Sequence, residues 1–324
     1  MADKTLLIGD IGGTNARFAL ADPEQTDFRD ALTLKCADFP SADDAIRHYI
    51  DAISGQSPDV ICLAVAGPVI DNRVRVTNNH WTLDAAKIGA DFGIEAVRLL
   101  NDFEAIAYSI PQLKTEHCEP IGLPVPKALR NDFNVGIVGP GTGLGVGGLY
   151  RRGQTYVPIV GEGGHVGFAP KSQVQVEIVS ALRSRFDRVS AERLVSGAGI
   201  ENIYWALTEI HDEQRTQLTP QEIFAKAKDE DDARAIETAQ MFFEVLGQVA
   251  GDLALTIGAE DGVYLAGGIA KRYPDLLQKS GFRAAFDDKG RHRAYMERIP
   301  TLLITHDEPG LLGAAYCALE SSSA

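Results

Sequence analysis

Apolar runs and helical patterns alternate along the first hundred residues. Residues 5–10 form an apolar run that closes on Asp-x-Gly-Gly-Thr, and 16–22 alternate between apolar and polar positions, so we predict two strands joined by a turn. Segment 41–53 carries its apolar residues on one helical face, with Ser41 as the N-cap. The continuous apolar run 60–69 predicts a strand buried on both faces, and 96–110 predicts a strand followed by a helix. This order indicates an α/β layer architecture.

The second half repeats the opening theme. An apolar strand, a Gly/Thr turn and a second strand follow one another in 134–153. Helical periodicity then runs through 174–186, 190–210 and 235–258. A final buried strand is predicted in 262–270, and 299–320 closes with a strand and a helix. Segment 111–132 is rich in proline and aperiodic, so it is the best candidate for a boundary between two domains.

Composition excludes several classes of partner. The 324 residues include 31 Lys and Arg against 45 Asp and Glu, a net charge of −14, so nucleic acid or an anionic membrane is not expected as the main partner. The four cysteines are scattered, which signals neither a disulfide framework nor a zinc site. The chain begins without the basic and apolar regions of a signal peptide, and no stretch is long enough to span a membrane. We therefore expect a cytoplasmic protein.

The glycine-rich segment 139–148 carries Gly143-x-Gly145-x-x-Gly148, the spacing of a dinucleotide-binding fingerprint, with Glu162 where a ribose-binding acid would stand. That motif requires a helix directly after the loop, because the pyrophosphate binds at the helix N-terminus. Six of the ten residues are glycine and a β segment follows, so a helix cannot start there. A Walker A loop is also excluded, since no Gly-Lys-Ser/Thr occurs in the chain.

What remains is a pair of Gly/Thr loops, 9–17 and 139–145, each between two predicted strands. Glycine lets backbone N–H groups approach phosphate oxygens closely, and Thr14 and Thr142 add hydroxyl donors. Neither loop contains Lys, so a metal must neutralise much of the charge, and Asp10 is the natural partner of Mg²⁺. Each loop alone is typical of a plain hairpin turn. Together with the Gly-Gly pair at 267–268, they favour nucleotide binding.

These loops resemble those of the superfamily of actin, hexokinase and the Hsp70 ATPases, and within it the chain is similar to the bacterial ATP-dependent glucokinases outside the ROK family. The resemblance rests on the segments GDIGGTNARFAL (9–20), AVAGPV (64–69), TNNHW (77–81), LLNDFEAIAYSI (99–110), GPGTGLG (139–145), GEGGHVGFAP (161–170), SAERLVSG (190–197), AGGIA (266–270), SGFRAAFDDKGR (280–291) and DEPGLLGAA (307–315). ROK kinases carry a cysteine-rich zinc motif that the scattered cysteines here cannot supply.

The resemblance implies an α/β, two-lobed actin-like (ribonuclease H-like) fold around a cleft that closes over the sugar. It implies a smaller α/β lobe of residues 1–111 and 301–324, to which the C-terminal helix returns. The larger α+β lobe would span residues 112–300. It also implies the reaction of ATP and D-glucose to ADP and D-glucose 6-phosphate, with Mg²⁺, in a homodimer. A kinase for mannose or an amino sugar, or a non-catalytic regulator on the same fold, remains an alternative.

The residue pattern alone does not identify a sugar-binding site. Asn101 and Glu104 suit the start of a helix, so helix capping explains Asn101 and Asp102 well. His165 alone is typical of a core histidine, while Glu162 suits a turn and Glu192 the first turn of a helix. A metal site at Glu162 and His165 lacks a third ligand nearby in the sequence.

The resemblance assigns roles to these residues. It makes Asp102 the general base, which mainly orients the sugar hydroxyl, because an Asp is a weak base for a resting alcohol. The hexose pocket would comprise Asn101, Asp102, Glu162, His165 and Glu192, with Asn78 and Trp81 near it. Nucleotide binding would fall to Asp10, Gly12, Gly13, Thr14, Asn15, Gly141, Thr142, Gly143, Gly267 and Gly268, with Asp10 also the metal ligand.

Overall fold

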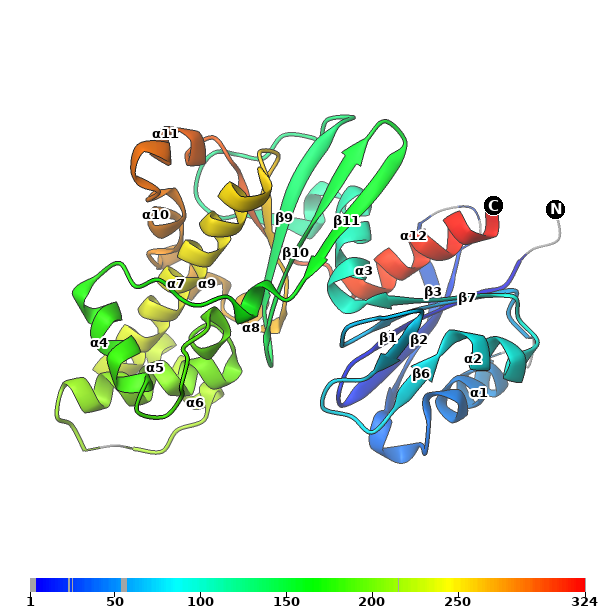
Figure 1. Ribbon diagram of the computed structural model, residues 1–324, viewed down its shortest axis with the longest axis horizontal. Coiled ribbons are helices and arrows are strands. Elements are labelled where there is room, and N and C mark those ends of the chain that lie inside the picture. The colour runs from blue at the N-terminus through cyan, green and yellow to red at the C-terminus, as the bar shows by residue number, and fades with distance from the viewer. Residues whose placement is uncertain (1–3, 23, 25, 54–56, 215, 324) are drawn as a thin grey trace. The chain divides into compact units, whose positions relative to one another are not determined.

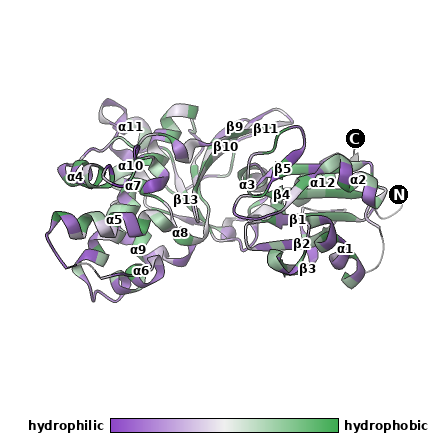
Figure 2. Cartoon of the chain, turned by 60° about the horizontal axis from the view of Figure 1, so that its bottom comes forward, coloured by the Kyte–Doolittle hydropathy of each residue, from purple (hydrophilic) through white to green (hydrophobic). Residues whose placement is uncertain are grey.

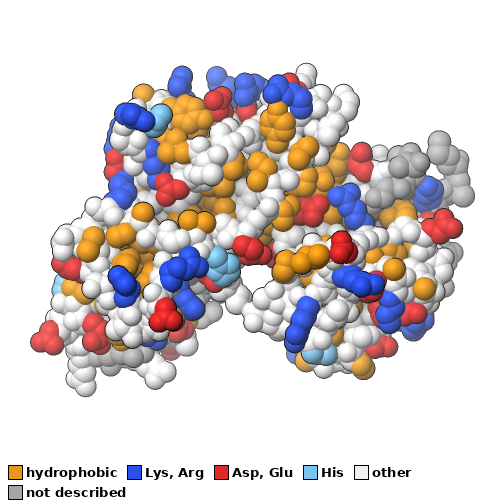
Figure 3. Space-filling view, viewed as in Figure 1, with side chains coloured by type: hydrophobic (Ala, Val, Ile, Leu, Met, Phe, Trp, Pro, Cys, Tyr) orange, Lys and Arg blue, Asp and Glu red, His pale blue; other side chains and the backbone are white. Residues whose placement is uncertain are grey.

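The protein divides into two compact units. The structure, a computed structural model, describes residues 4–22, 24, 26–53, 57–214 and 216–323. Unit 1 comprises Met1–Lys114 and His306–Ala324, and unit 2 comprises Thr115–Thr305 (Figure 1). On the face drawn in Figure 3, basic and acidic side chains are interspersed among the described residues. Within the described part of the chain, no helix is both long and apolar enough to cross a membrane.

Unit 1 is built on a five-stranded sheet in the order β3-β2-β1-β4-β7. Its strands are β1 (Leu6–Ile11), β2 (Asn15–Ala21), β3 (Phe28–Lys35), β4 (Val60–Val65) and β7 (Ala96–Asn101), beside the small hairpin of β5 (Arg73–Arg75) and β6 (Thr82–Asp84). Its helices are α1 (Ala42–Ile53), α2 (Ala85–Phe92), α3 (Asp102–Ser109) and α12 (Pro309–Ser323). Strands β1, β4 and β7 are parallel, so their carboxyl ends share one edge of the sheet.

Helices cover both faces of this sheet, as Figure 1 shows for α3 and α12 on one side and α1 and α2 on the other. Every residue of β4 is buried, which explains its unbroken apolar run in place of alternation. Leu7 and Ile11 of β1 pack with Tyr49 of α1 and Ile88 of α2 in one cluster. Helix α12 returns from the far end of the sequence and packs on α3, β1 and β4.

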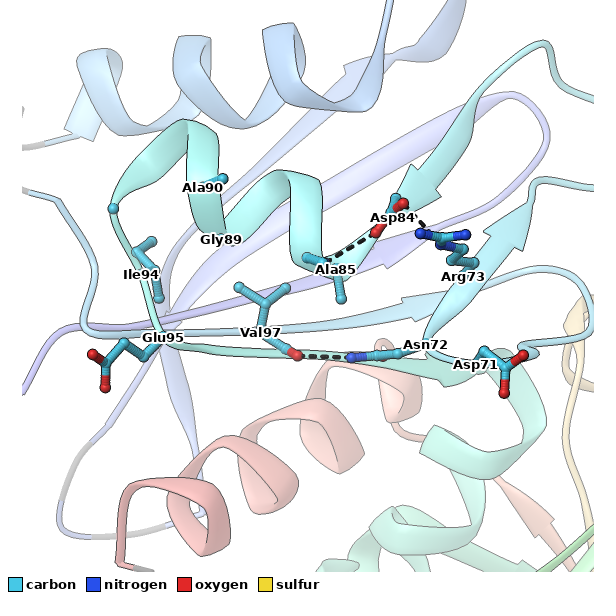
Figure 4. A pocket seen from close by; sticks show the side chains of 12 residues that line it. Asp71, Asn72, Arg73, Asp84, Ala85, Gly89, Ala90, Ile94, Glu95 and Val97 are labelled. Atoms are coloured by element: carbon cyan, nitrogen blue, oxygen red, sulfur yellow. Dashed lines mark hydrogen bonds and ion pairs between the residues drawn. The ribbon is translucent and has the colours of Figure 1, made fainter.

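The outer edge of β7 is covered by one side chain. Asn72 Nδ2 donates to the Val97 carbonyl oxygen at 3.0 Å, and the Leu99 N–H donates to Asn72 Oδ1 at 2.8 Å. The Asn72 side chain thus makes the two hydrogen bonds that the backbone of a neighbouring strand would make. Its φ is 56°, a left-handed value that asparagine tolerates. It lies at the rim of a cavity of about 720 Å³ between α2 and β7, drawn in Figure 4. None of the predicted site residues lines this cavity.

We predict that Asn72→Gly lowers the free energy of unfolding by about 1–3 kcal/mol, the worth of two hydrogen bonds. Glycine accepts the positive φ, so the loss reports the side chain alone. Urea denaturation measures it, with Asp71→Gly as the control, since Asp71 has a similar φ of 50° in the same turn. Equal stability of the two variants would contradict the role of Asn72.

Unit 2 is built on a six-stranded mixed sheet in the order β11-β10-β9-β12-β13-β8. Its strands are β8 (Cys118–Pro120), β9 (Phe133–Pro140), β10 (Leu144–Arg152), β11 (Thr155–Gly161), β12 (Val263–Leu265) and β13 (Thr301–Ile304). Its helices are α4 (Gln173–Leu182), α5 (Gly197–Ile210), α6 (Pro220–Lys228), α7 (Ala233–Ile257), α8 (Gly268–Arg272), α9 (Pro274–Lys279), α10 (Phe282–Asp287) and α11 (Arg293–Met296). Helix α7 is the centre of the helical layer, because α5, α6 and α10 all pack against it.

The core of unit 2 gathers aromatic side chains around α7. Phe224 of α6 lies 5.4 Å from Phe242 and 5.8 Å from Phe243 of α7, measured between ring centroids. All three rings are fully buried. Figure 2 shows the hydrophobic residues of both units along the strands and the helix faces that pack on them.

The structure differs from the sequence prediction at the domain boundaries and in some elements. Residues 112–114, predicted for the larger lobe, belong to unit 1, and the strand predicted over 262–270 ends at Leu265, before α8 begins at Gly268. Residues 301–305 belong to unit 2 and not with the returning C-terminal segment, because β13 pairs with β12 and β8. Segment 190–196 is not an α-helix: it forms a 3-10 turn at Ala191–Arg193, and α5 begins only after its N-cap, Ser196. The four cysteines are free thiols.

Candidate active site

The first Gly/Thr loop, residues 12–14, is the tight turn between β1 and β2 in unit 1, and we call it loop 1. The Gly12 N–H donates to the Asn15 carbonyl oxygen at 2.9 Å, which closes the turn. The Cys36 N–H donates to the Thr14 carbonyl oxygen at 2.9 Å and anchors the loop from outside. Strand, turn and returning strand therefore occur as the apolar pattern predicts, with no helix after the loop.

The predicted general base, metal ligand and one predicted sugar ligand lie at the carboxyl edge of the sheet in unit 1. Asp10 is paired in register with Ala64 of β4, and Val65 of β4 with Asn101 of β7, so the ends of these three parallel strands are aligned. Asp102 follows Asn101 directly as the first residue of α3. The register thus brings Asp10, Asn101 and Asp102 to one edge, although they are far apart in the sequence.

Asn101 caps α3, as the residue pattern indicates. Its Oδ1 accepts from the N–H groups of Phe103 and Glu104 at 3.0 and 3.4 Å. Its Nδ2 donates to the Gly67 carbonyl oxygen at 2.9 Å, in the loop after β4. These three bonds fix the start of α3 and hence the backbone of Asp102.

The negative charge at this edge is concentrated. The pKa of Asp10 is raised to about 6, mainly by burial; Arg17 lowers it, and the nearby carboxylates of Asp102 and Glu308 raise it. Arg17 also pairs with Glu308, at 3.0 Å from Nε to Oε1. A Cβ on Gly310, in the first turn of α12, would lie 2.9 Å from Asp10 Oδ2, so α12 packs directly against this carboxylate.

Asn78 and Trp81 have different surroundings. A Cβ on Gly13 would lie 3.2 Å from the Cβ of Asn78, so Asn78 adjoins loop 1, and both line a surface hollow of about 820 Å³. Asn78 is exposed and has a φ of 59°. Trp81 is buried in the core of unit 1 and donates from Nε1 to the Phe39 carbonyl oxygen at 3.2 Å; its proximity to the sugar pocket stays a prediction.

The second Gly/Thr loop, residues 141–143, is the turn between β9 and β10 in unit 2, and we call it loop 2. The Gly141 N–H donates to the Gly143 carbonyl oxygen at 2.9 Å, and the Gly141 carbonyl oxygen accepts from the Gly197 N–H at 2.8 Å. The Thr142 side chain is exposed at the tip. Gly267 adjoins the same turn, because a Cβ there would lie 2.5 Å from the Pro140 carbonyl oxygen.

Gly268 begins α8 directly after this contact, and no atom lies within 4 Å of the position its Cβ would take. Parallel pairing of β9 with β12 explains the proximity, since the loops after both strands leave the same sheet edge. Unit 2 therefore brings Gly141, Thr142 and Gly143 together with Gly267 and Gly268.

Three predicted sugar-binding residues form one cluster in unit 2. His165 Nε2 lies 4.0 Å from Glu162 Oε2, and His165 Nδ1 lies 4.0 Å from Glu192 Oε1. The side chains of Glu162 and His165 are 68% and 56% exposed, so His165 is not a core histidine. Arg188 donates to the His165 carbonyl oxygen at 2.8 Å, and the Ala191 N–H donates to that of Val166 at 2.9 Å, which ties the two loops together.

The described side chains do not form a protein-only metal site, since no three His, Cys, Asp or Glu residues among them are placed to share an ion. Mg²⁺ fits this chain through Asp10 instead, because a divalent cation would relieve the repulsion among Asp10, Asp102 and Glu308. Sequence reasoning missed Arg17, Glu308 and Gly310 at this edge. The signal for Glu308 and Gly310 was present in the segment DEPG (307–310), whose glycine admits the Asp10 side chain.

The matching family model and several similar sequences are those of glucokinases. The family model described as Glucokinase matches residues 7–321. The glucokinase of Nitrobacter hamburgensis is 42% identical over 315 residues, which cover 97% of each chain.

Solved structures give the same fold. The glucokinase from an Antarctic psychrotroph superimposes with a TM-score of 0.89 at 33% identity, over 99% of this chain and 100% of that one. A ROK family glucokinase from Streptomyces griseus, in complex with glucose and AMPPNP, gives a TM-score of 0.65 at 20% identity, over 98% of this chain and 99% of that one. The latter likeness concerns the fold alone.

Proposed function

This chain belongs to the glucokinase family, and we propose that it transfers the γ-phosphoryl group of ATP to D-glucose with Asp102 as the general base. It is an enzyme of the hexokinase type, which forms glucose 6-phosphate and ADP. The observation that carries the assignment of the base is the strand register of unit 1, which aligns Asp102 with Asp10 and loop 1 at one sheet edge.

Loop 1 and loop 2 would hold the phosphates through backbone N–H groups and the hydroxyls of Thr14 and Thr142. Both loops are turns between paired strands, so the orientation of their N–H groups is fixed before the nucleotide binds. The loops would therefore lose little conformational entropy on binding. Gly267 and Gly268 would admit the adenosine, because Gly268 leaves open space where a side chain would stand. Asp10 would hold Mg²⁺, which would neutralise part of the negative charge of the phosphates.

The residues proposed to bind the sugar are Asn101, Asp102, Glu162, His165 and Glu192. Carboxylates accept from sugar hydroxyls, whereas Asn101 Nδ2 has one hydrogen to donate besides the one bound to the Gly67 carbonyl oxygen. The Asn101 cap holds the backbone of Asp102, whose carboxylate would orient the 6-hydroxyl for attack. In a loose phosphoryl-transfer transition state the proton leaves late, and Asp102 then accepts it.

Initial rates with ATP, Mg²⁺ and a panel of hexoses test the substrate. We expect D-glucose to have the highest kcat/KM, with mannose and glucosamine lower by at least about tenfold, because polar groups that contact glucose hydroxyls would lose hydrogen-bond partners. A higher kcat/KM for another hexose would assign that sugar as substrate instead. No sugar phosphate from any hexose would favour a regulator on this fold.

The two-lobed actin-like arrangement around a closing cleft, the homodimer and the cytoplasmic location stay predictions.

A further inference from the structure

Glu192 contacts both the predicted sugar site and loop 2. Its Oε1 lies 4.0 Å from His165 Nδ1, whereas its Oε2 accepts a hydrogen bond from the Leu144 N–H at 3.0 Å. Leu144 is the first residue after loop 2 and the start of β10. The Glu192 side chain is 29% exposed, much less than the side chains of Glu162 and His165. One carboxylate therefore joins a sugar-binding cluster to a phosphate-binding turn inside a single unit.

The contact between Glu192 and loop 2 is close. A Cβ on Gly143 would lie 2.7 Å from Glu192 Oε2, so loop 2 and this oxygen leave no room for a side chain between them. The backbone around Glu192 holds the same turn at a second point, through the bond from Gly197 N–H to the Gly141 carbonyl oxygen. Ser196 joins these two points: its Oγ donates to the Glu192 carbonyl oxygen at 2.8 Å and caps α5 by accepting from the Gly199 N–H at 3.0 Å.

We infer that Glu192 is a positioning residue that couples sugar binding to the nucleotide, in addition to contacting the sugar; this inference rests on the proposed function. When a sugar hydroxyl donates to Oε1, the carboxylate loses rotational freedom. Oε2 is then held against the Leu144 N–H, and loop 2 is fixed in the form that receives phosphate. Loop 2 is therefore partly ordered once glucose is bound, so nucleotide binding costs less conformational entropy.

The coupling is reciprocal, because binding free energies around a closed cycle must agree. If glucose tightens nucleotide binding by some factor, the nucleotide tightens glucose binding by the same factor. We expect a factor of about ten, within the usual range for coupled sites. Glu192→Gln keeps the size of the side chain but lacks the charge that strengthens the bond to Leu144. This substitution should therefore bring the factor by which glucose tightens nucleotide binding close to one.

Isothermal titration of the full-length protein with Mg-AMPPNP, with and without saturating glucose, measures this factor. Glu192→Asp is the second variant, because it keeps the charge yet is one methylene too short to contact both His165 and Leu144. Glu201→Gln, an exposed position on α5, is the control for charge removal and should keep the wild-type factor. Thermal unfolding identifies variants that are folded.

The inference is supported if both Glu192 variants bind each ligand while the factor falls to within about twofold of one. An unchanged factor in both folded variants, with only glucose binding weakened, would show that Glu192 serves the sugar alone and overturns the inference. A wild-type factor of one overturns it as well. Failure of the wild-type protein to bind glucose at all would instead contradict the proposed function, and the coupling with it.

Discussion

Asp102→Asn is expected to lower kcat by about 10²–10⁴-fold, the usual contribution of a general base, while the Kd for glucose changes little. Asparagine has the shape of aspartate and still orients a hydroxyl by accepting its hydrogen bond, but it cannot take the proton. The fold should tolerate the change. Asn101 fixes the start of α3 through its own side chain, and one acid in a first turn is worth only about 0.3–1 kcal/mol.

The rate of ADP formation in a coupled assay and glucose titration by calorimetry measure the two quantities. Asp84→Asn is the matched control: Asp84 caps α2 in the same unit, and asparagine caps a helix as well as aspartate does. It should keep wild-type kcat. A kcat for Asp102→Asn within a few-fold of wild type would show that Asp102 is not the general base. Loss of glucose binding would show that its main role is to bind the sugar.

Gly313→Ala is expected to destabilise the protein by about 3 kcal/mol, the upper range for an overpacked core. Gly313 lies where α12 crosses α3, and a Cβ there would stand 1.7 Å from the Ala105 carbonyl oxygen. The helices must therefore separate. At an unhindered helical position the same change would stabilise by about 1 kcal/mol, so the sign of the result is diagnostic.

The separation should also lower activity, because α3 begins at Asp102 and the first turn of α12 contacts Asp10 through Gly310. Urea denaturation and kcat measure the two effects. Gly167→Ala is the control, since no atom lies within 4 Å of a Cβ at that position, and it should be neutral or slightly stabilising. A Gly313→Ala variant as stable as wild type would show that the two helices can separate without cost.

The sequence predicts the strands and turns of the site well, because they depend on local pattern. The apolar runs before Asp10 and Asn101, and the glycines of both loops, give β1, β7 and the two tight turns. Strand β3 was missed because, as the outer strand of its sheet, it exposes most of its residues and lacks an apolar run. The periodicity of segment 190–196 predicts a helix, whereas Ser196 caps the start of α5 and leaves Glu192 in a 3-10 turn.

The arrangement of the site could not be predicted from pattern alone, because it depends on which strands pair. The proximity of Asp10 to Asp102 follows from the register of β1, β4 and β7, and that of Gly267 to loop 2 from the pairing of β9 and β12. The bond from Leu144 N–H to Glu192 spans 48 residues and has no local signal. The family resemblance named Glu192 as a sugar ligand but gave no indication of its contact with loop 2.

The most direct test of the account is the identity of the products formed by the purified protein from ATP, Mg²⁺ and glucose, followed by ³¹P nuclear magnetic resonance. We predict that glucose 6-phosphate and ADP form in equal amounts in the wild-type protein, and at a rate lower by orders of magnitude in Asp102→Asn. ADP that accumulates with inorganic phosphate and without glucose 6-phosphate would contradict the account.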